Sequence, residues 1–491
     1  MNEKSSQLQL YRDMIKLTLE QEFDRVVSLD CTNPEEICYA QKLHIFFGHY
    51  ENKKIFINRM NSNGVYVLPD EALKQINLSW LRLNLSKLRF RAYVVLLGAF
   101  CLFRFVALLL KWNNFSSAGV SAVVLGINSR HANDITNSYT FSSWLQKNFY
   151  STLEQFPHPE IFEKAFIPPK LGIGRRLLCA LTAAWLFIQG LTELFFGNYK
   201  RMLLLDEFLM ASAVKCANKA ALPAAFFYCY QGTILRPLWT YAAETHGSRV
   251  ILFFNSSSAE PSLDGGARDN LFLRYMNWPE IIPFNSLIGN SVAKYINRKT
   301  NIHLLPTLYV HDSDLISQSE FERKNLVSIF DIPPIRGTHH IGYSENIDYL
   351  QAAGVSQVEF LKAFYQACFV ALEGLPVEIL VKPKKITNRI EPDYLEMLNV
   401  WQSQKKITLL PHSVSPYRLV NLSKLSIVEP FTSVGHFFES QSNICFFDVL
   451  KILPSNHASA HGQKLCVGLE ELQKWVAQNF SANSHEPHSQ K

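Results

Sequence analysis

The sequence predicts an α/β protein of two domains, each a parallel sheet covered by helices, with a pair of apolar helices in the N-terminal half. Short runs that are apolar throughout, such as 120–127 and 425–428, are typical of strands that are buried on both faces. Segments with apolar residues at helical spacing alternate with these runs. The chain has 491 residues, which is too long for a single hydrophobic core.

The composition excludes several classes of protein. A hydrophobic content of 48% with 18% charged residues indicates a well-buried globular chain and not a disordered one. The net charge of +6 is spread thinly and forms no basic stripe, which argues against nucleic-acid binding but suits contact with phosphates or an anionic membrane. Nine cysteines lie scattered without a CxxC pair and predict reduced core thiols in a cytoplasmic protein. We expect no metal site and no tightly bound cofactor.

The N-terminal half begins with a mixed region over 1–85, followed by an α/β domain over 86–312. Strand candidates of the mixed region lie at 54–57 and 65–68. In the α/β domain we expect strands at 120–127, 224–230 and 249–254, and helices at 139–156 and 234–245. Gly247 just past the last of these helices is a stop signal.

A polar linker at 313–325 leads to a C-terminal Rossmann-like domain over 326–480, and the polar tail at 481–491 is predicted to be disordered. Strands are expected at 326–332, 378–381, 407–410, 425–428 and 444–447, and helices at 359–372, 391–401, from Ser415-Pro416 onward, and at 469–480. Two Rossmann-like domains that face a cleft would form a natural two-substrate site.

Two apolar segments of the N-terminal half, 92–110 and 177–196, are each about long enough to cross a bilayer, which takes roughly 20 residues. Arg104 and Glu193 interrupt them, and the strand at 120–127 lies between them, which argues against spanning helices. Three alternatives stay open: a helical hairpin on the membrane face, buried helices, or spanning helices.

Turns that follow successive strands of the C-terminal domain carry the candidate ligand-binding residues. The turn after 425–428 is expected to open a helix. The candidates are Asp331, Pro333, Lys382, Pro383, Lys384, His412, Pro430, Phe431, Thr432, Ser433 and, about two turns into that helix, Glu439. In a parallel sheet these turns emerge at one edge, where they offer cations, hydroxyls and helix-start N–H groups to a phosphate.

The order of these motifs resembles a known family. A strand followed by Lys382-Pro383, then Leu409-Leu410-Pro411, then a strand followed by the tetrapeptide at 430–433 resembles the donor half of bacterial surface-polysaccharide glycosyltransferases with the GT-B fold. Polysialyl-, Kdo- and glycerophosphotransferases are distantly similar, and the polysaccharide biosynthesis PFTS-motif proteins are more closely similar. The resemblance covers roughly 326–450 well and the N-terminal half in outline.

The resemblance implies a GT-B-like fold and a nucleotide-sugar donor that is CMP-, UDP- or GDP-linked. It places Lys382, Pro383, Thr432 and Ser433 around the donor phosphate. The relatives carry His-Pro where this chain has Lys384-Lys385, so the nucleotide stays open.

The acceptor side is expected in the N-terminal domain, because an inverting transferase needs a general base for the acceptor hydroxyl. Asp134 and His131, after the strand at 120–127, are the candidates, and Arg130 would hold an anionic acceptor. Gln231, after the strand at 224–230, is a second candidate for the cleft. The alternative for 126–134 is a polar surface loop.

The resulting hypothesis is a glycosyltransferase that works as a peripheral protein at the inner face of the plasma membrane. It would move a sugar from the nucleotide-activated donor to a surface polysaccharide or a lipid-linked glycan. Two alternatives share the fold: a catalytically inactive scaffold in polysaccharide assembly, and a phosphotransferase that uses a CDP-polyol.

Overall fold

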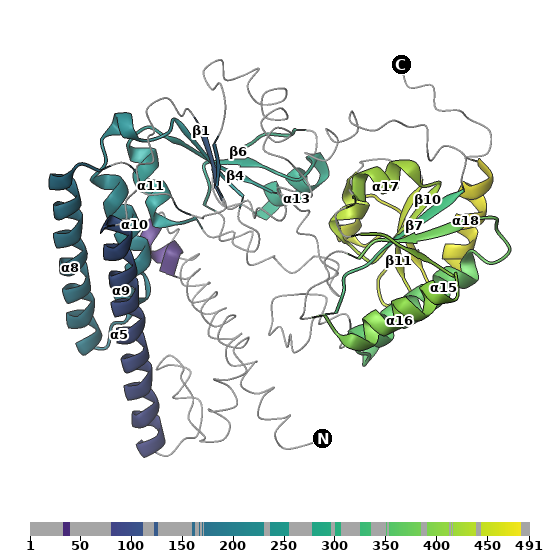
Figure 1. Cartoon of the computed structure of the whole chain (residues 1–491), viewed down its shortest axis with the longest axis horizontal. Coiled ribbons are helices and arrows are strands. Elements are labelled where there is room, and N and C mark those ends of the chain that lie inside the picture. The colour runs from purple at the N-terminus through teal and green to yellow at the C-terminus, as the bar shows by residue number, and fades with distance from the viewer. Residues whose placement is uncertain are drawn as a thin grey trace.

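The computed structural model contains two six-stranded sheets, each parallel throughout and covered by helices (Figure 1). The residues that it describes are 33–39, 80–110, 122–125, 160–162, 166, 169, 171–229, 236–254, 277–295, 300–305, 325–334, 350, 353–383, 390–411, 414, 416–437 and 443–482. The predicted α/β class with two Rossmann-like domains is confirmed by these sheets, which follow one another along the chain in the GT-B-like manner.

The N-terminal sheet has the strand order β2-β1-β3-β4-β5-β6. Its strands are β1 (Ala122–Leu125), β2 (Glu160–Phe162), β3 (Ala225–Tyr228), β4 (Arg249–Phe253), β5 (Glu280–Ile282) and β6 (Asn301–Ile302). All residues of β1 and β3 are buried, which explains their uninterrupted apolar sequence. Gly247 has φ +90° and separates α11 (Leu238–Thr245) from β4, so the predicted stop signal is present.

The C-terminal sheet has the order β12-β11-β10-β7-β8-β9. Its strands are β7 (Leu326–Phe330), β8 (Glu378–Val381), β9 (Thr408–Leu409), β10 (Leu425–Val428), β11 (Ile444–Asp448) and β12 (Leu465–Val467). Its helices are α15 (Gln357–Ala371), α16 (Pro392–Ser403), α17 (Pro416–Leu422) and α18 (Leu469–Ala482). Five of these strands overlap the predicted ones, whereas β12 was not predicted.

One prediction about this domain differs in detail from the structure. The segment after β10 was expected to be a helix whose first turn carries Thr432 and Ser433. It is instead the short 3-10 helix η5 (Ser433–His436). Gly435 shows why the chain stays so close to the sheet, because a Cβ atom there would fall 2.2 Å from the ring of Phe446 in β11. Close packing against β11 therefore requires a glycine at position 435.

The apolar segments of the N-terminal half form two long helices, α5 (Trp80–Leu110) and α8 (Ile173–Phe195), which pack against each other. The short helix α9 (Lys200–Leu203) fits between them: a Cβ atom on Gly98 of α5 or on Gly190 of α8 would clash with Met202. Helix α10 (Leu205–Lys215) packs on α5, α8 and α11. By length and composition alone, α8 could cross a membrane.

Further described helices are η2 (Lys219–Ala221), α13 (Ser286–Tyr295), η6 (Ala458–Ala460) and a short helix at 34–39. Several predictions lie outside the described residues: the strands at 54–57 and 65–68, the helix at 139–156, the linker at 313–325 apart from Asn325, and the tail from 483 onward. The apolar core forms two clusters, one centred on each sheet, and Tyr417 and Phe437 of the C-terminal domain belong to the N-terminal cluster.

Candidate functional site

The strand order of the C-terminal sheet places a switch point between β7 and β10. The chain runs from β7 outward through β8 and β9, and then crosses over to β10, β11 and β12 on the other side. In open α/β sheets ligands bind in the crevice at the carboxyl ends of the two strands that flank such a point. The segments that follow β7 and β10 are therefore the candidate site.

Backbone and carboxylate contacts fasten these two segments together. The backbone N–H of Glu429, after β10, donates to the carbonyl of Phe330 at 2.9 Å. In return the Glu429 carboxylate accepts from the N–H of Ile332 at 2.6 Å. Glu429 is 2% exposed, so this charge-assisted bond is protected from water. The edge of the sheet is thereby held in one arrangement before any ligand binds.

Asp331 secures the turn after β7 from the inside. One of its carboxylate oxygens accepts from the hydroxyl of Tyr365 at 2.8 Å and from that of Tyr394 at 2.7 Å. Burial raises the pKa of Asp331 to about 6, although both tyrosine hydrogen bonds act in the opposite direction. Its second oxygen, Oδ1, is buried and has no hydrogen-bond partner among the described residues. The geometry is that of an anchor between the turn and helices α15 and α16.

The tetrapeptide at 430–433 forms the turn after β10, and three of its four residues are buried. Phe431 has φ +60°, an uncommon conformation for a bulky residue. Its ring stacks on His457 at 4.8 Å and meets the edge of Phe446 at 5.2 Å. Ser433 alone is partly exposed. The first three residues thus shape the turn, and Ser433 is the one that a ligand can reach.

Thr432 lies at the N-cap of η5, but its side chain makes no cap hydrogen bond. Its Oγ1 is buried and has no hydrogen-bond partner among the described residues. A buried hydroxyl in that state is costly unless something satisfies it. The two predicted hydroxyls therefore both lie in the turn after β10, but Thr432 is buried whereas Ser433 is partly exposed.

Lys382 and Pro383 follow β8, the neighbour of β7 on the other side from β10. Val381 of β8 is in register with Ile329 of β7, so Lys382 leaves the sheet at the same edge as Asp331. Lys382 is half-buried. The structure thus brings the cation and the 430–433 turn to one edge, as the sequence predicts. Lys384, His412 and Glu439 lie outside the described residues.

The segment after the tetrapeptide lies against the N-terminal domain. Phe437 packs on Phe284 with ring centroids 5.7 Å apart. The side-chain amide of Asn285 donates to the carbonyl of His436 at 2.6 Å. The His436 ring is fully buried beside His461, and both effects lower its pKa to about 3, so this ring is neutral. The candidate site therefore borders the contact between the two domains.

The predicted acceptor-side residues Arg130, His131, Asp134 and Gln231 lie outside the described residues. The N-terminal sheet has its own switch point, between β1 and β3, and the segments that follow those strands are the ones that carry these residues. Their placement stays a prediction from the sequence.

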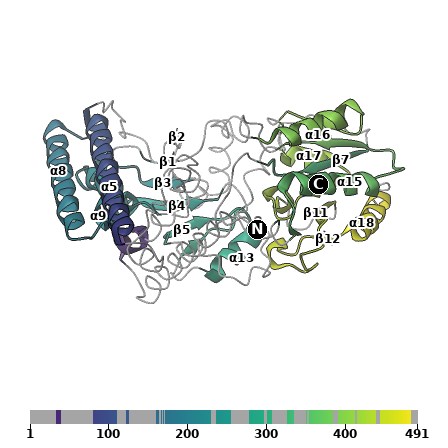
Figure 2. The ribbon, with the colours of Figure 1, turned by 90° about the horizontal axis from the view of Figure 1, so that it is seen from below.

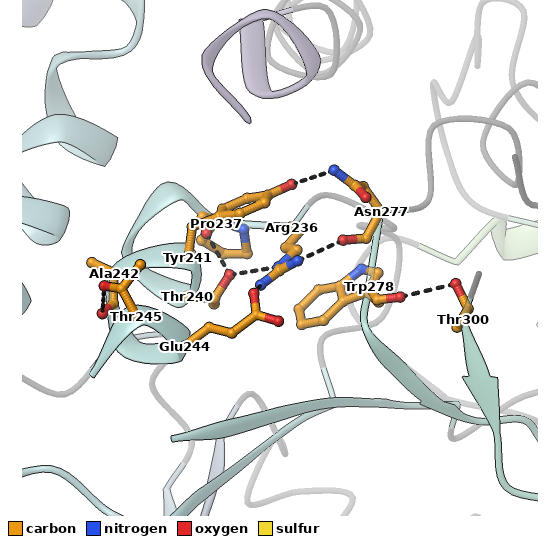
Figure 3. Close-up of polar contacts among 10 residues, drawn as sticks. All are labelled: Arg236, Pro237, Thr240, Tyr241, Ala242, Glu244, Thr245, Asn277, Trp278 and Thr300. Atoms are coloured by element: carbon orange, nitrogen blue, oxygen red, sulfur yellow. Dashed lines mark hydrogen bonds and ion pairs between the residues drawn. The ribbon is translucent and has the colours of Figure 1, made fainter. Parts of the chain in front are cut away.

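A fully buried arginine fixes the nearest described part of this region (Figure 3). Arg236 donates to the carbonyl of Asn277 at 2.8 Å and to the Thr240 hydroxyl at 3.1 Å, and it forms an ion pair with Glu244. Its guanidinium lies 3.7 Å from the centre of the Tyr241 ring. With all sides occupied and no exposure, Arg236 holds α11 to the segment before β5 and is not placed to bind a ligand.

Four residues that shape the site were not predicted: Tyr365, Tyr394, Glu429 and Arg236. Glu429 had a usable signal, since it is a charged residue directly after a buried strand at an expected ligand edge. The tyrosines had none, because they come from the middle or start of helices whose faces the sequence does not orient toward Asp331. Among the described residues, no group of three or more His, Cys, Asp or Glu could hold a metal ion.

Comparison with known proteins gives one family match. The model of the family described as polysaccharide biosynthesis PFTS motif protein matches residues 184–476, more than half of the chain. No curated protein matches in sequence.

Two solved structures are similar in outline. One is the α,α-trehalose 6-phosphate synthase of Burkholderia multivorans, with 11% identity, a TM-score of 0.37, and 74% of this chain and 91% of that chain covered. The other is MurG of Acinetobacter baumannii, with 10% identity, a TM-score of 0.30, and 75% and 96% covered. At such low scores neither adds to what the two parallel sheets show.

Proposed function

The chain belongs to the polysaccharide biosynthesis PFTS motif family, and from this membership we propose that it is a nucleotide-sugar-dependent glycosyltransferase. It transfers a sugar to a surface polysaccharide or to a lipid-linked glycan. The donor is a CMP-, UDP- or GDP-sugar that binds reversibly, and no tightly bound cofactor takes part.

The observation that carries this proposal is the place of the family tetrapeptide. Pro430 to Ser433 lie at the switch point between β7 and β10, where sheets of this kind bind nucleotides. Lys382 leaves the same edge from the neighbouring strand β8. A hydroxyl and a cation that converge on one sheet edge suit an anionic phosphate.

In the proposed reaction the bond between the sugar and the donor phosphate breaks, and the phosphate leaves with an added negative charge. Lys382 and the Ser433 hydroxyl stabilise that charge as it develops, which is commonly the largest single contribution to catalysis. A base of the N-terminal domain, for which His131 and Asp134 are the candidates, takes the proton of the acceptor hydroxyl, and the acceptor oxygen forms the new bond to the anomeric carbon of the sugar.

The test is a thermal-shift panel of the purified protein with CMP-, UDP-, GDP- and CDP-linked donors. One sugar nucleotide is expected to raise Tm, because a ligand that binds only the folded state stabilises it. Ser433→Ala and Lys382→Ala should each weaken that binding about tenfold, equivalent to about 1.4 kcal/mol. Ser403→Ala is the matched control, since this exposed serine lies at the far end of α16.

The outcomes separate the alternatives. A shift with a CDP-polyol alone would favour the phosphotransferase. No shift with any nucleotide would favour the inactive scaffold and would overturn the proposal.

A further inference from the structure

Helices α5 and α8 expose an apolar surface that no described residue covers. Of the exposed large apolar side chains among the described residues, all but Leu304, Val370 and Val400 lie on α5, on α8 or at Phe196 directly after α8. On α8 the exposed face includes Leu181, Trp185 and Ile188. On α5 it comprises Leu88, Leu96, Phe100, Phe103 and Leu110. Exposed apolar side chains gathered on two neighbouring helices mark a contact with another apolar phase.

The buried side of α8 is a narrow seam and accounts for only a small part of its apolar residues. The buried residues of the helix are Cys179, Ala183, Gly190 and Leu194, which recur at intervals of four or seven residues. This seam faces α5, α9 and α10, and the opposite face is exposed. The outward residues are therefore not the core of the domain, which removes one of the three alternatives left open by the sequence.

The two helices run antiparallel, and basic residues mark both ends of the exposed face. Arg91 of α5 lies within 3.8 Å of where a Cβ atom on Gly197 would be, beyond the end of α8. Arg201 follows at that same end and pairs with Glu193. At the other end, Arg175 of α8 donates to the carbonyl of Cys216. Arg104 is exposed on α5 between these ends.

We propose that this face of α5 and α8 binds the surface of a lipid bilayer that contains anionic lipids. The apolar side chains enter the outer part of the hydrocarbon layer, and Arg91, Arg104 and Arg175 reach the headgroups. A second copy of the chain fits less well, because both ends of the face are basic and any self-contact along the helices brings like charges together. The predicted location at the inner face of the plasma membrane is part of this proposal.

The helices lie on the bilayer and do not cross it. Helix α10 packs along the buried side of α8, and it also packs against α11, a helix of the sheet domain. Its buried Glu207 accepts from the N–H of Leu238 at the start of α11 at 2.9 Å. If α8 crossed the membrane, α10 with Asp206, Glu207 and Lys215 would be drawn into the hydrocarbon, which is costly.

This orientation gives the two domains different environments. In both views α5 and α8 lie at one end of the molecule and the C-terminal sheet lies at the other (Figures 1 and 2). The bilayer therefore meets the N-terminal domain, and the candidate donor edge stays in water. A lipid-linked acceptor would reach the N-terminal domain from the membrane; this last step alone rests on the proposed function.

The test is cosedimentation of the full chain with vesicles of phosphatidylcholine, with and without 30 mol% phosphatidylglycerol. We expect the protein to sediment with the anionic vesicles and at least threefold less with the neutral ones. The variant Leu181→Glu/Trp185→Glu/Ile188→Glu should lower binding at least tenfold. The matched control is Val370→Glu/Val400→Glu, which places charges on exposed apolar positions of the C-terminal domain and should bind normally.

Three further measurements keep the result interpretable. Unchanged circular dichroism and Tm show that the α8 variant folds, and an unchanged nucleotide-induced Tm shift separates membrane binding from donor binding. Vesicle binding without any nucleotide binding would leave this inference standing while the proposed function fails. The membrane proposal would be overturned if the α8 variant bound vesicles as well as wild type does. It would also be overturned if the wild-type protein were a dimer without lipid, the α8 variant were a monomer, and neither protein bound vesicles.

Discussion

At Asp331 the chain holds a carboxyl group where water cannot reach it, at the edge that we assign to the donor. Tyr365 and Tyr394 both donate to one oxygen, and Glu429 lies on the neighbouring strand end. Burial dominates, so the pKa of Asp331 is raised to about 6. The group therefore stabilises the folded state less when it is ionised than when it is protonated.

The sign of the pH dependence follows from that shift. In the unfolded chain the pKa of an aspartate is about 3.9. The folded state therefore binds the Asp331 proton more tightly than the unfolded state does. The loss of stability caused by ionising Asp331 is absent below about pH 4 and complete above about pH 6. A shift of about two units corresponds to about 3 kcal/mol in the free energy of unfolding.

Asp331→Asn removes the charge and keeps an oxygen for the two tyrosine hydroxyls. We expect the variant to gain stability relative to wild type at pH 7.5 and to lose most of that gain at pH 4.5. Urea unfolding of both proteins at the two pH values measures the difference. A difference that does not change with pH would show that Asp331 is not held as described.

Arg236 provides a second test at a single residue. Removing the fully buried Arg236 side chain leaves its buried partners unsatisfied, so Arg236→Ala should lower the free energy of unfolding by about 3 kcal/mol. The control is Arg201→Ala, since Arg201 pairs with Glu193 at a partly exposed position, and such pairs contribute about 0–1 kcal/mol. Equal losses in the two variants would contradict the role given to Arg236.

Single residues also show how far sequence reasoning reaches. The sequence places Lys382 and Ser433 at one edge, because a parallel sheet sends every carboxyl strand end to the same side. It does not show that Thr432 and Asp331 are buried, because burial depends on which helix covers them. The acceptor-side residues His131 and Asp134 stay predictions, since they lie outside the described residues.

At the scale of elements, the family tetrapeptide combines two tasks within one turn. Phe431 is 1% exposed and packs in the left-handed conformation between His457 and Phe446. Ser433 is partly exposed. In this motif the aromatic residue therefore sets the shape of the turn, and the last hydroxyl is the group that a ligand can reach.

This division predicts opposite behaviour for two neighbouring substitutions. Phe431→Ala should cost about 3–5 kcal/mol in unfolding free energy, because it removes a buried ring and leaves a cavity. Ser433→Ala should leave stability within about 0.5 kcal/mol and reduce nucleotide binding. Chemical denaturation and nucleotide titration on both variants measure the two effects. A stable Phe431→Ala protein, or an unstable Ser433→Ala protein, would contradict this division.

Elements also explain which boundaries could be predicted. Helix α15 begins at Gln357, two residues before the predicted start, because Ser356 and Glu359 form a capping box that the periodicity did not use. The strands at 378–381 and 425–428 are present with the predicted bounds. The helix expected after β10 is the short 3-10 helix η5, in which Phe446 leaves room only for a glycine at position 435.

At the scale of the molecule, the segment after the tetrapeptide joins the two domains. Phe437 and Tyr417 belong to the N-terminal apolar core, although both come from the C-terminal domain. Asn285 adds a hydrogen bond to the same segment. The contact begins at His436, three residues after Ser433, so a shift of the donor edge would be passed directly to the contact between the domains.

Weakening that contact should uncouple the domains. We expect Phe437→Ala combined with Asn285→Ala to split one calorimetric unfolding transition into two, or to lower Tm of the first by several degrees. Phe195→Ala, on the exposed face of α8, serves as the control and should leave the transition in lipid-free solution unchanged. A single unshifted transition in the double variant would contradict the domain contact.

Hydrogen–deuterium exchange with and without the sugar nucleotide that stabilises the protein tests directly whether the donor binds at this edge of the C-terminal sheet. We expect slower exchange at 430–437 and 331–334, the two segments beside the switch point between β7 and β10, and no change in α10. Protection confined to other parts of the chain, with 430–437 unaffected at saturating nucleotide, would contradict it.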